Sequence, residues 1–288
     1  MSAPSIERSL VRKAHQVLDP FHALTYLAPH CGAAFHAVGL TGLWDGYFGG
    51  RSAPLGAVEP AAVSAVFYHF KPSMVADAMA GLWDRATPEQ ALQARLAGMD
   101  AALRSLLPGA TGNREIAEAA ALAAGAAAAI SVPARPLGAA NQALLVPLHP
   151  HLALWQAITT LREFRGDGHV IALAEAGLDG VEALVTAVAA GIERRASIQA
   201  RRGWTDDEWA AGECRLAERG LLAADGSLTE TGWQVRKTVE DRTDHFAEPP
   251  LRALGARAVA RMLEIVSPLT EQVVTGLRPG KKVTSQRV

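Results

Sequence analysis

A cluster of charged residues interrupts apolar, alanine-rich sequence in the second half of the chain. The segment reads Leu-Arg-Glu-Phe-Arg-Gly-Asp-Gly-His-Val over residues 161–170 and contains Arg162, Glu163, Arg165, Asp167 and His169. Apolar residues with helical spacing flank it on both sides, so we expect these side chains to lie close to a core. Because a buried charge is costly unless it is paired, the cluster needs a structural or a functional reason.

Two interpretations of this cluster stay open. In the functional one, Arg162 and Arg165 are one helical turn apart and clamp an anion or carboxylate, and Glu163 is a further ligand-binding residue. Asp167 and His169 are then the candidate catalytic residues, with His169 as the acid/base. In the structural one, Arg165 pairs with Asp167, and Asp167 caps a helix that follows the Gly-Asp-Gly break.

A second set of polar and aromatic residues lies in the first half of the chain. His22 and Tyr26 are four residues apart and share a helix face, and Arg51 follows a Tyr-Phe pair. Tyr68 and His69 are adjacent, so at most one of them points into any given pocket. We predict that all five contribute to ligand binding, with packing in a core or interface as the alternative for the histidines.

The sequence contains no motif for a metal or a cofactor. His-Glu-x-x-His and paired Cys-x-x-Cys patterns are absent, and Cys31 and Cys214 follow no metal or disulfide spacing. There is no glycine-rich phosphate loop, nucleophile elbow or dinucleotide fingerprint either. We therefore predict a protein without a metal site and without a cofactor.

The composition is that of a water-soluble globular protein in a reducing compartment. Hydrophobic residues make up 49% and charged residues 20% of 288 residues, which is enough for a large core and by default two domains. The N-terminus lacks an apolar signal core, and residues 117–130 form an alanine run too short to span a bilayer. We predict a cytoplasmic protein with no membrane partner.

Hydrophobic periodicity predicts a mainly helical chain. Capping boxes at Thr87 and Thr205 mark two helix starts, and residues 220–229 read as two short strands around the Asp225-Gly226 turn. The predicted helices cover residues 5–18, 20–28, 29–38, 59–71, 72–82, 87–107 and 115–130, then 150–165, 169–176, 181–195, 197–201, 205–219, 230–246 and 251–274.

The two halves of the sequence can be overlaid on each other. Gly39-Leu40 and Gly177-Leu178 are 177 − 39 = 138 positions apart, and the same offset aligns their neighbours. This pattern predicts an internal duplication. The predicted organisation is a degenerate winged-helix-like domain over 1–130, a proline-rich linker over 131–150, a winged-helix domain over 151–275 and a disordered basic tail over 276–288.

The order of elements from Ser197 to Val239 resembles a winged helix of the MarR type. The whole chain is similar to a family of helix-turn-helix proteins that share the Arg-Gly-Asp-Gly-His run and a Tyr-Phe…Arg…Ala-Pro-Leu-Gly run, here Tyr47-Phe48 and Arg51 to Gly56. The resemblance implies tandem MarR-like domains with a small β-hairpin wing, forming a single-chain pseudo-dimer. It also implies a small aromatic or anionic ligand between the winged-helix lobe and the long helices.

The charges at the expected recognition helix disfavour DNA binding. That helix begins Asp206-Asp207-Glu208 and adds Glu213, and its wing carries no arginine. A recognition helix needs basic or amide side chains towards phosphates and base edges, and the net charge of −1 offers no global attraction to nucleic acid.

The favoured hypothesis is a small-molecule-binding protein that has lost ordinary DNA binding. One alternative is a ligand-responsive transcriptional regulator that binds DNA. Another is a cofactor-free enzyme that uses the Arg/Asp/His cluster. In each case the protein acts as a pseudo-dimeric monomer or as a homodimer.

Overall fold

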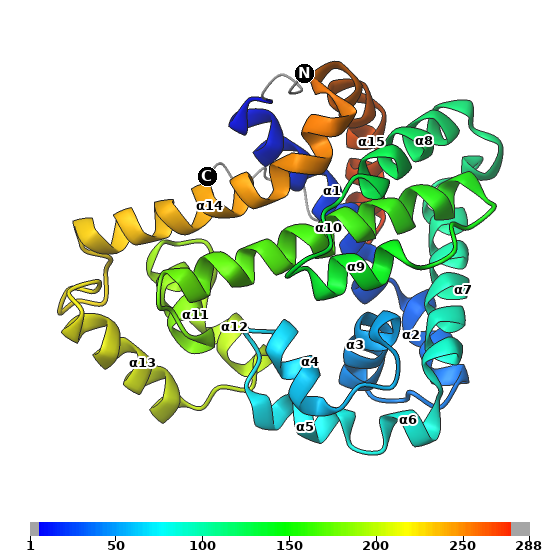
Figure 1. The fold of residues 1–288 in the computed structure, drawn as a ribbon. Helices are drawn as coiled ribbons and strands as arrows, with labels where there is room; N and C mark the ends of the chain where they lie inside the picture. The colour runs from blue at the N-terminus through cyan, green and yellow to red at the C-terminus, as the bar shows by residue number, and fades with distance from the viewer. Residues whose placement is uncertain (1–5, 278–288) are drawn as a thin grey trace. The chain divides into compact units, whose positions relative to one another are not determined.

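The computed structural model describes residues 6–277, and these are almost entirely helical (Figure 1). The first half contains α1 (Arg8–Leu27), α2 (Pro29–Ala37), α3 (Leu43–Ser52), α4 (Pro60–Val66), α5 (Pro72–Met79), α6 (Leu82–Arg85), α7 (Pro88–Leu106), α8 (Arg114–Ala128) and α9 (Pro136–Gln142). The second half contains α10 (Pro150–Glu175), α11 (Gly180–Ala189), α12 (Arg195–Arg201), α13 (Asp206–Glu218), α14 (Glu230–Leu254) and α15 (Ala256–Leu277). The mainly helical prediction is confirmed. The predicted tail beyond Leu277 lies outside the described residues.

The predicted pair of strands is reduced to one antiparallel bridge. Leu222 and Leu228 form it, and the turn between them is closed by a hydrogen bond from the Ala223 N–H to the Ser227 carbonyl. Gly226 supplies the positive φ of +80° that this turn requires. A two-stranded ribbon without a third strand gains little stability, so pairing does not extend beyond the bridge.

The chain forms two compact units that alternate along the sequence. Unit 1 contains residues up to 58, then 81–167 and the segment from 244, and unit 2 contains 59–80 and 168–243. The N-terminal and C-terminal halves of the sequence each contribute residues to both units. The helices α10 and α14 also have residues in unit 1 and in unit 2. The predicted division into domains over 1–130 and 151–275 with a linker over 131–150 stays a prediction.

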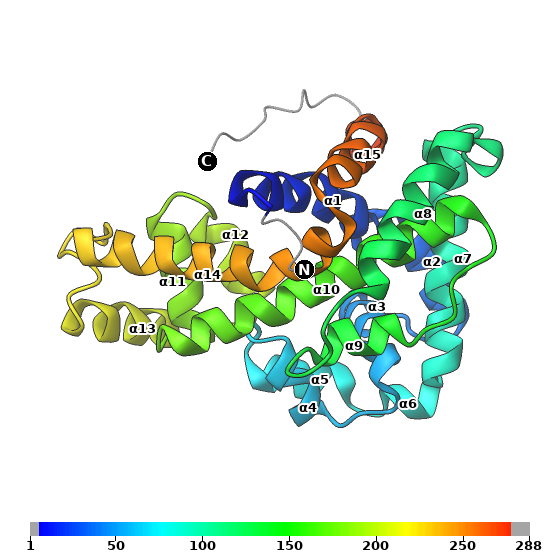
Figure 2. The same cartoon turned by 45° about the horizontal axis from the view of Figure 1, so that its top comes forward.

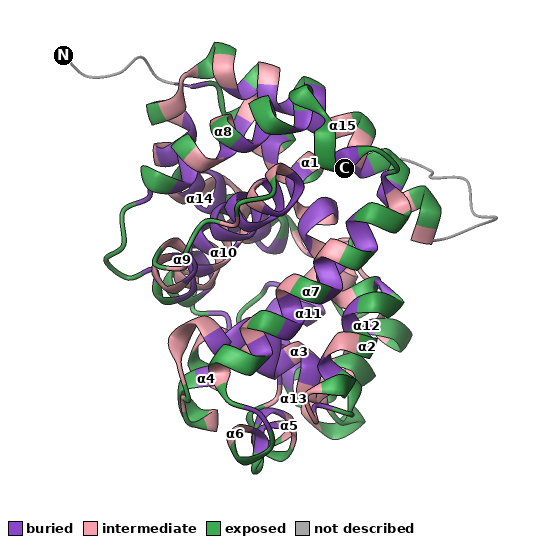
Figure 3. Cartoon of the chain, turned by 90° about the vertical axis from the view of Figure 1, so that its right-hand side faces the viewer, coloured by how far each residue is buried: buried purple, intermediate pink, exposed green. Residues whose placement is uncertain are grey.

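Unit 1 is built on long helices around an apolar core. α1 lies beside α15 and α2 lies beside α7, as both views in Figures 1 and 2 show. Phe21, Met99, Trp155 and Met262 are almost completely buried in this core, and buried and exposed residues alternate along its helices (Figure 3). The alanine-rich α8 buries its small side chains against α15, as expected for a core helix. Among residues 6–277 no helix is both long and apolar enough to cross a bilayer.

Three predicted helix breaks are wrong. α10 continues through Gly166-Asp167-Gly168, α1 continues through Pro20, and α14 continues through Pro249-Pro250 until Gly255, whose φ of +88° ends it. Each glycine in a helix interior costs about 1 kcal/mol relative to alanine. Burial of flanking apolar residues offsets such costs, as for Phe164 and Leu173 on either side of the glycines in α10.

Unit 2 packs α4 and α5 against the segment that contains α11, α12 and α13. The backbone N–H of Lys71 donates to the Arg202 carbonyl, and the Lys71 ammonium lies 2.7 Å from Glu208 in the first turn of α13. Gly180 has no space for a side chain because the Tyr68 carbonyl lies against it. The side chain of Met74 lies against Gly203. The segment around Met74 therefore covers the turn between α12 and α13.

Candidate functional site: a buried polar cavity in unit 1

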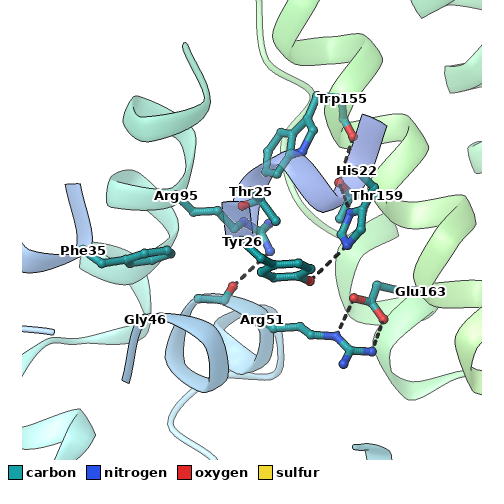
Figure 4. Close-up of a pocket in the computed structure, with 11 residues that line it drawn as sticks. His22, Thr25, Tyr26, Phe35, Gly46, Arg51, Arg95, Trp155, Thr159 and Glu163 are labelled. Carbon is teal, nitrogen blue, oxygen red and sulfur yellow. Dashed lines mark hydrogen bonds and ion pairs between the residues drawn. The ribbon is translucent and has the colours of Figure 1, made fainter. Parts of the chain in front are cut away.

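A directional chain of hydrogen bonds runs through the core of unit 1 (Figure 4). Thr159 donates its hydroxyl proton to the Trp155 carbonyl one turn earlier on α10, at 2.8 Å. Its oxygen therefore accepts from Nδ1 of His22, at 3.1 Å, and Nε2 of His22 accepts the hydroxyl of Tyr26 at 3.0 Å. Burial lowers the pKa of His22 to about 3, so this ring is neutral at physiological pH.

An ion pair closes one side of the same cavity. Arg51 binds Glu163 through two parallel hydrogen bonds, from Nε at 2.8 Å and from Nη2 at 2.9 Å, and both side chains are buried. Arg162 adds a third donor to Glu163 at 2.9 Å and reaches Asp19 at 3.3 Å. Although burial alone raises the pKa of a carboxyl group, Arg51 and Arg162 together hold that of Glu163 far below its ordinary value.

The glycines of α3 place Arg51 in this pair. Gly46 and Gly50 lie directly against the ring of Phe35, and a β-carbon on Gly50 would overlap that ring. Gly49 faces Leu40 and Leu82 in the same way. Only a helix with small residues on these faces can approach so closely, and this approach brings the last turn of α3 to α10.

Arg95 is the functional candidate that the sequence analysis missed. This arginine of α7 is buried, and its hydrogen-bond acceptors are the Gly50 carbonyl at 3.1 Å and the side-chain oxygens of Asn141 and Gln156, both at 3.4 Å. All three are neutral, and no carboxylate of the described residues lies within ion-pair distance. Burial lowers the pKa of Arg95 to about 10, so it still carries its charge at neutral pH.

The sequence does contain a signal for Arg95. It occupies the helix face that also carries Met99 and Ala102, which are completely buried. A single arginine at a core position of an amphipathic helix indicates either a buried partner or an anion.

The remaining space in the cavity is small and has an unpaired donor beside it. The indole N–H of Trp155 is completely buried and has no hydrogen-bond partner among the described residues. The volume open to the centre of a water molecule is about 10 Å³, which is room for about one water. The predicted residues His22, Tyr26, Arg51 and Glu163 all line this space (Figure 4).

Other residues of the predicted cluster have separate partners. Arg165 turns to Asp244, at 3.4 Å, and Asp167 accepts a hydrogen bond of 2.8 Å from the backbone N–H of Gly138. Asp167 thus binds the first turn of α9, and the prediction that it caps a helix after residue 168 is wrong because α10 does not break there. Burial raises the pKa of Asp167 to about 6.

The remaining predicted residues lie in unit 2. The rings of His69 and His169 stack with their centroids 5.7 Å apart, and Tyr68 donates to the Leu178 carbonyl at 2.7 Å. His169 Nδ1 lies 2.9 Å from the hydroxyl oxygen of Thr243, which itself donates to the Val239 carbonyl. His169 therefore carries its proton on Nδ1 when neutral and keeps Nε2 as an acceptor. Within residues 6–277 no cluster of three or more metal-ligating side chains is placed to hold an ion.

The residues of the recognition-helix candidate α13 that are exposed as a whole include no arginine or lysine, although the side chain of Arg215 on the same helix is 43% exposed. The exposed residues there are Asp206, Asp207, Ala210, Ala211, Cys214, Ala217 and Glu218. Arginines that lie nearby are paired with acids of the same unit: Arg195 with Asp206, and Arg215 with Asp179 and Glu182.

Comparison with known proteins identifies the family of the chain. Neither the curated proteins nor the solved structures contain a match to this chain. A family model described as a helix-turn-helix family matches residues 11–279, which is almost the whole sequence. The chain therefore belongs to a helix-turn-helix family.

Proposed function

We propose that this helix-turn-helix protein binds a small anion, such as a carboxylate group, in the cavity beside Arg95. The observation that carries the proposal is the charge on Arg95, which is buried with neutral partners only. Such a charge is destabilising unless an anion accompanies it. Glu163 does not pair with Arg95 as well, because its two oxygens are already shared between Arg51 and Arg162.

The other donors at the cavity support an anion over a neutral occupant. The Trp155 N–H is an unused donor, and the Arg95 guanidinium lies 5.3 Å from the centroid of the same indole. Anions accept hydrogen bonds and donate none, so a site with surplus donors and surplus positive charge favours them. One water would satisfy the indole but would leave the charge of Arg95 uncompensated.

We further propose that ordinary DNA binding has been lost. The acidic exposed face of α13 repels phosphate, and the Lys71–Glu208 ion pair ties its first turn to the segment before α5. Met74 covers the turn at Gly203 that a helix-turn-helix protein must bring close to the duplex. A DNA-binding regulator remains the alternative, since it is the usual function of such a scaffold.

The scaffold itself is proposed to be a tandem of MarR-like domains derived by duplication. The helices α3, α4, α5, α7 and α8 of the first half have the order and similar spacing of α11, α12, α13, α14 and α15 in the second. α1 and α2 together take the place of α10, with Pro29 at the position of Asp167. The catalytic roles predicted for Asp167 and His169 stay predictions.

Thermal shift measurements test the anion site. Acetate should raise the melting temperature of the wild-type chain with a hyperbolic dependence on concentration. Arg95→Met should abolish this increase, whereas Arg104→Met, at an exposed position of the same helix, should keep it. An equal response of both variants would rule out the site. For DNA, a mobility-shift assay at low salt should show no sequence-specific complex, and nanomolar specific binding would overturn the proposed loss.

A further inference from the structure

A second, larger space lies on the other side of Arg95 within unit 1. It has a volume of about 220 Å³ and lies between α8, the end of α9 and the first half of α10. Five alanines line it, among them Ala127 on α8 and Ala153 and Ala157 on α10. The other lining residues are the apolar Leu144 and Val146 and the polar Asn141, Gln142, Gln156 and Thr160. A dry cavity of about 150 Å³ is known to accept benzene, so this space is large enough for a short apolar chain or one ring.

Asn141 and Gln156 separate this alanine-lined pocket from Arg95. Both amides line the pocket, and their oxygens are the acceptors of Arg95 Nη2 at 3.4 Å. Gln156 Nε2 also donates a 3.3 Å hydrogen bond to the Asn141 backbone carbonyl. These bonds are near the upper limit for hydrogen bonds, whereas a carboxylate binds a guanidinium at about 2.8 Å.

From this arrangement we infer that the ligand is a monocarboxylate with an apolar tail. The tail occupies the alanine-lined pocket, and the carboxylate displaces the amide oxygens of Asn141 and Gln156 from Arg95. This inference rests on the proposed anion site and specifies the chemistry of the molecule that uses it.

The surface around the pocket supports an apolar ligand. Leu145, Val146 and Leu148 follow α9 directly and are 94%, 64% and 98% exposed. Exposed large apolar residues gathered in one short segment often mark a binding site rather than a random part of the surface. Val146 belongs to the pocket wall itself, so a bound tail would cover part of this apolar segment.

Calorimetric titration of the full chain with three probes tests the inference. Acetate supplies the carboxylate with almost no tail, hexan-1-ol supplies the apolar tail without a carboxylate, and hexanoate supplies both. Each buried methylene tightens binding by about fourfold, so hexanoate should bind at least about 100-fold more tightly than acetate. Hexanoate should also bind far more tightly than hexan-1-ol, and Arg95→Met should remove this difference.

Variants that fill the alanine-lined pocket test the contribution of the apolar tail to affinity. Ala153→Phe on α10 and Ala128→Phe on α8 place a ring in the alanine-lined pocket from two different walls. Each should reduce hexanoate affinity at least to that of acetate, because the ring occupies the space of the apolar tail. Ala174→Phe, an exposed position of α10, is the matched control and should bind hexanoate like the wild type.

The outcomes distinguish this inference from the proposed function. If acetate binding depends on Arg95 but hexanoate binds no more tightly, the tail pocket is overturned and the anion site stands. If hexanoate and hexan-1-ol bind equally and Arg95→Met changes neither, the pocket stands and the anion site is overturned. If no probe binds, both are overturned. Hexanoate binding that Ala153→Phe and Ala128→Phe leave at wild-type strength also overturns the pocket.

Discussion

The guanidinium of Arg95 lies against the ring of Trp155 in one buried site, and the two side chains form no hydrogen bond with each other. The guanidinium carbon of Arg95 lies 5.3 Å from the centroid of the Trp155 ring, and the indole N–H is left without a partner among the described residues. Cation–π attraction contributes about 2 kcal/mol in a desolvated site, which is less than the desolvation cost of the cation. The fold therefore tolerates a local destabilisation at this point.

The first prediction is that removal of this charge stabilises the protein. Arg95→Met keeps much of the side-chain length and removes an uncompensated buried cation, so the free energy of unfolding should rise by about 1 kcal/mol or more in the absence of ligand. Urea denaturation measures this change. Arg104→Met, at an exposed position of α7, should change the same quantity by less than about 0.5 kcal/mol. A clear loss of stability in Arg95→Met would show that Arg95 is a structural residue with adequate partners.

The second prediction is that substitution of Glu163 lowers the free energy of unfolding, in contrast to substitution of Arg95. Glu163→Gln leaves the buried Arg51 without its bidentate partner and removes one partner of Arg162. Breaking a buried pair from one side costs about 3–5 kcal/mol, so the urea midpoint should fall strongly. Glu264→Gln, at an exposed carboxylate paired with Arg261, should leave the midpoint almost unchanged. Comparable effects of the two variants would contradict the assignment of Glu163 as the anchor of the cavity.

Local signals predicted the helix starts, and tertiary contacts decided the helix interiors. Thr87 and Thr205 begin their helices with the expected capping boxes because the donors and acceptors involved are three residues apart. Pro20 and Gly168 were interpreted as breaks, but the helices continue because their flanking apolar residues are buried by segments distant in the sequence. Such long-range burial is not visible in the local pattern.

The candidate site also combines contacts that a local sequence pattern predicts with contacts that depend on tertiary packing. Helical spacing brought His22 and Tyr26 together correctly, since four residues separate them on one face. Their meeting with Glu163 and Arg51 depends on the packing of α1, α3 and α10, which no local pattern specifies. Arg95 was missed for this reason: its importance lies in the absence of a carboxylate within ion-pair distance among the described residues, and only the three-dimensional arrangement shows which acids are paired with it.

The third prediction uses the ionisation of Asp167. Its pKa is about 6 in the folded protein and about 3.9 in an unfolded chain, so the folded state binds more protons between these values. The contribution of Asp167 to the free energy of unfolding is therefore lost as the pH rises from about 4 to about 6 and stays lost above that. Asp167→Asn keeps an oxygen acceptor for the Gly138 N–H and removes the charge, so this variant should be more stable than the wild type at pH 8 by about 3 kcal/mol.

Chemical denaturation at pH 4 and at pH 8 measures this effect. The advantage of Asp167→Asn should shrink at pH 4, where the wild-type carboxyl group is neutral in the folded state and about half protonated in the unfolded chain. Asp207→Asn, on the exposed face of α13, is the control and should show no such difference. An advantage that is the same at both pH values would mean that the variant acts through packing and not through ionisation.

The fourth prediction concerns His22, whose contribution to stability is lost as the pH falls, whereas that of Asp167 is lost as the pH rises. Burial lowers its pKa from 6.5 to about 3, so between these values the unfolded chain binds more protons than the folded one. The stabilisation from keeping His22 neutral is complete above pH 6.5 and is lost as the pH falls towards 3, by a few kcal/mol in all. Protonation would also break the chain from Tyr26, because Nε2 could no longer accept the phenol.

His22→Gln should flatten this acidic limb of the stability profile. Glutamine can still place an oxygen near Tyr26 and does not titrate, so its free energy of unfolding should depend less on pH between 6.5 and 3 than that of the wild type. His36→Gln, at an exposed position of α2, should keep the wild-type dependence. Direct titration of the His22 ring by NMR gives an independent reading: its nitrogen shifts should show a neutral ring at pH 5, whereas titration near 6.5 would show that the ring exchanges with solvent and that the Tyr26–His22–Thr159 chain is not held closed.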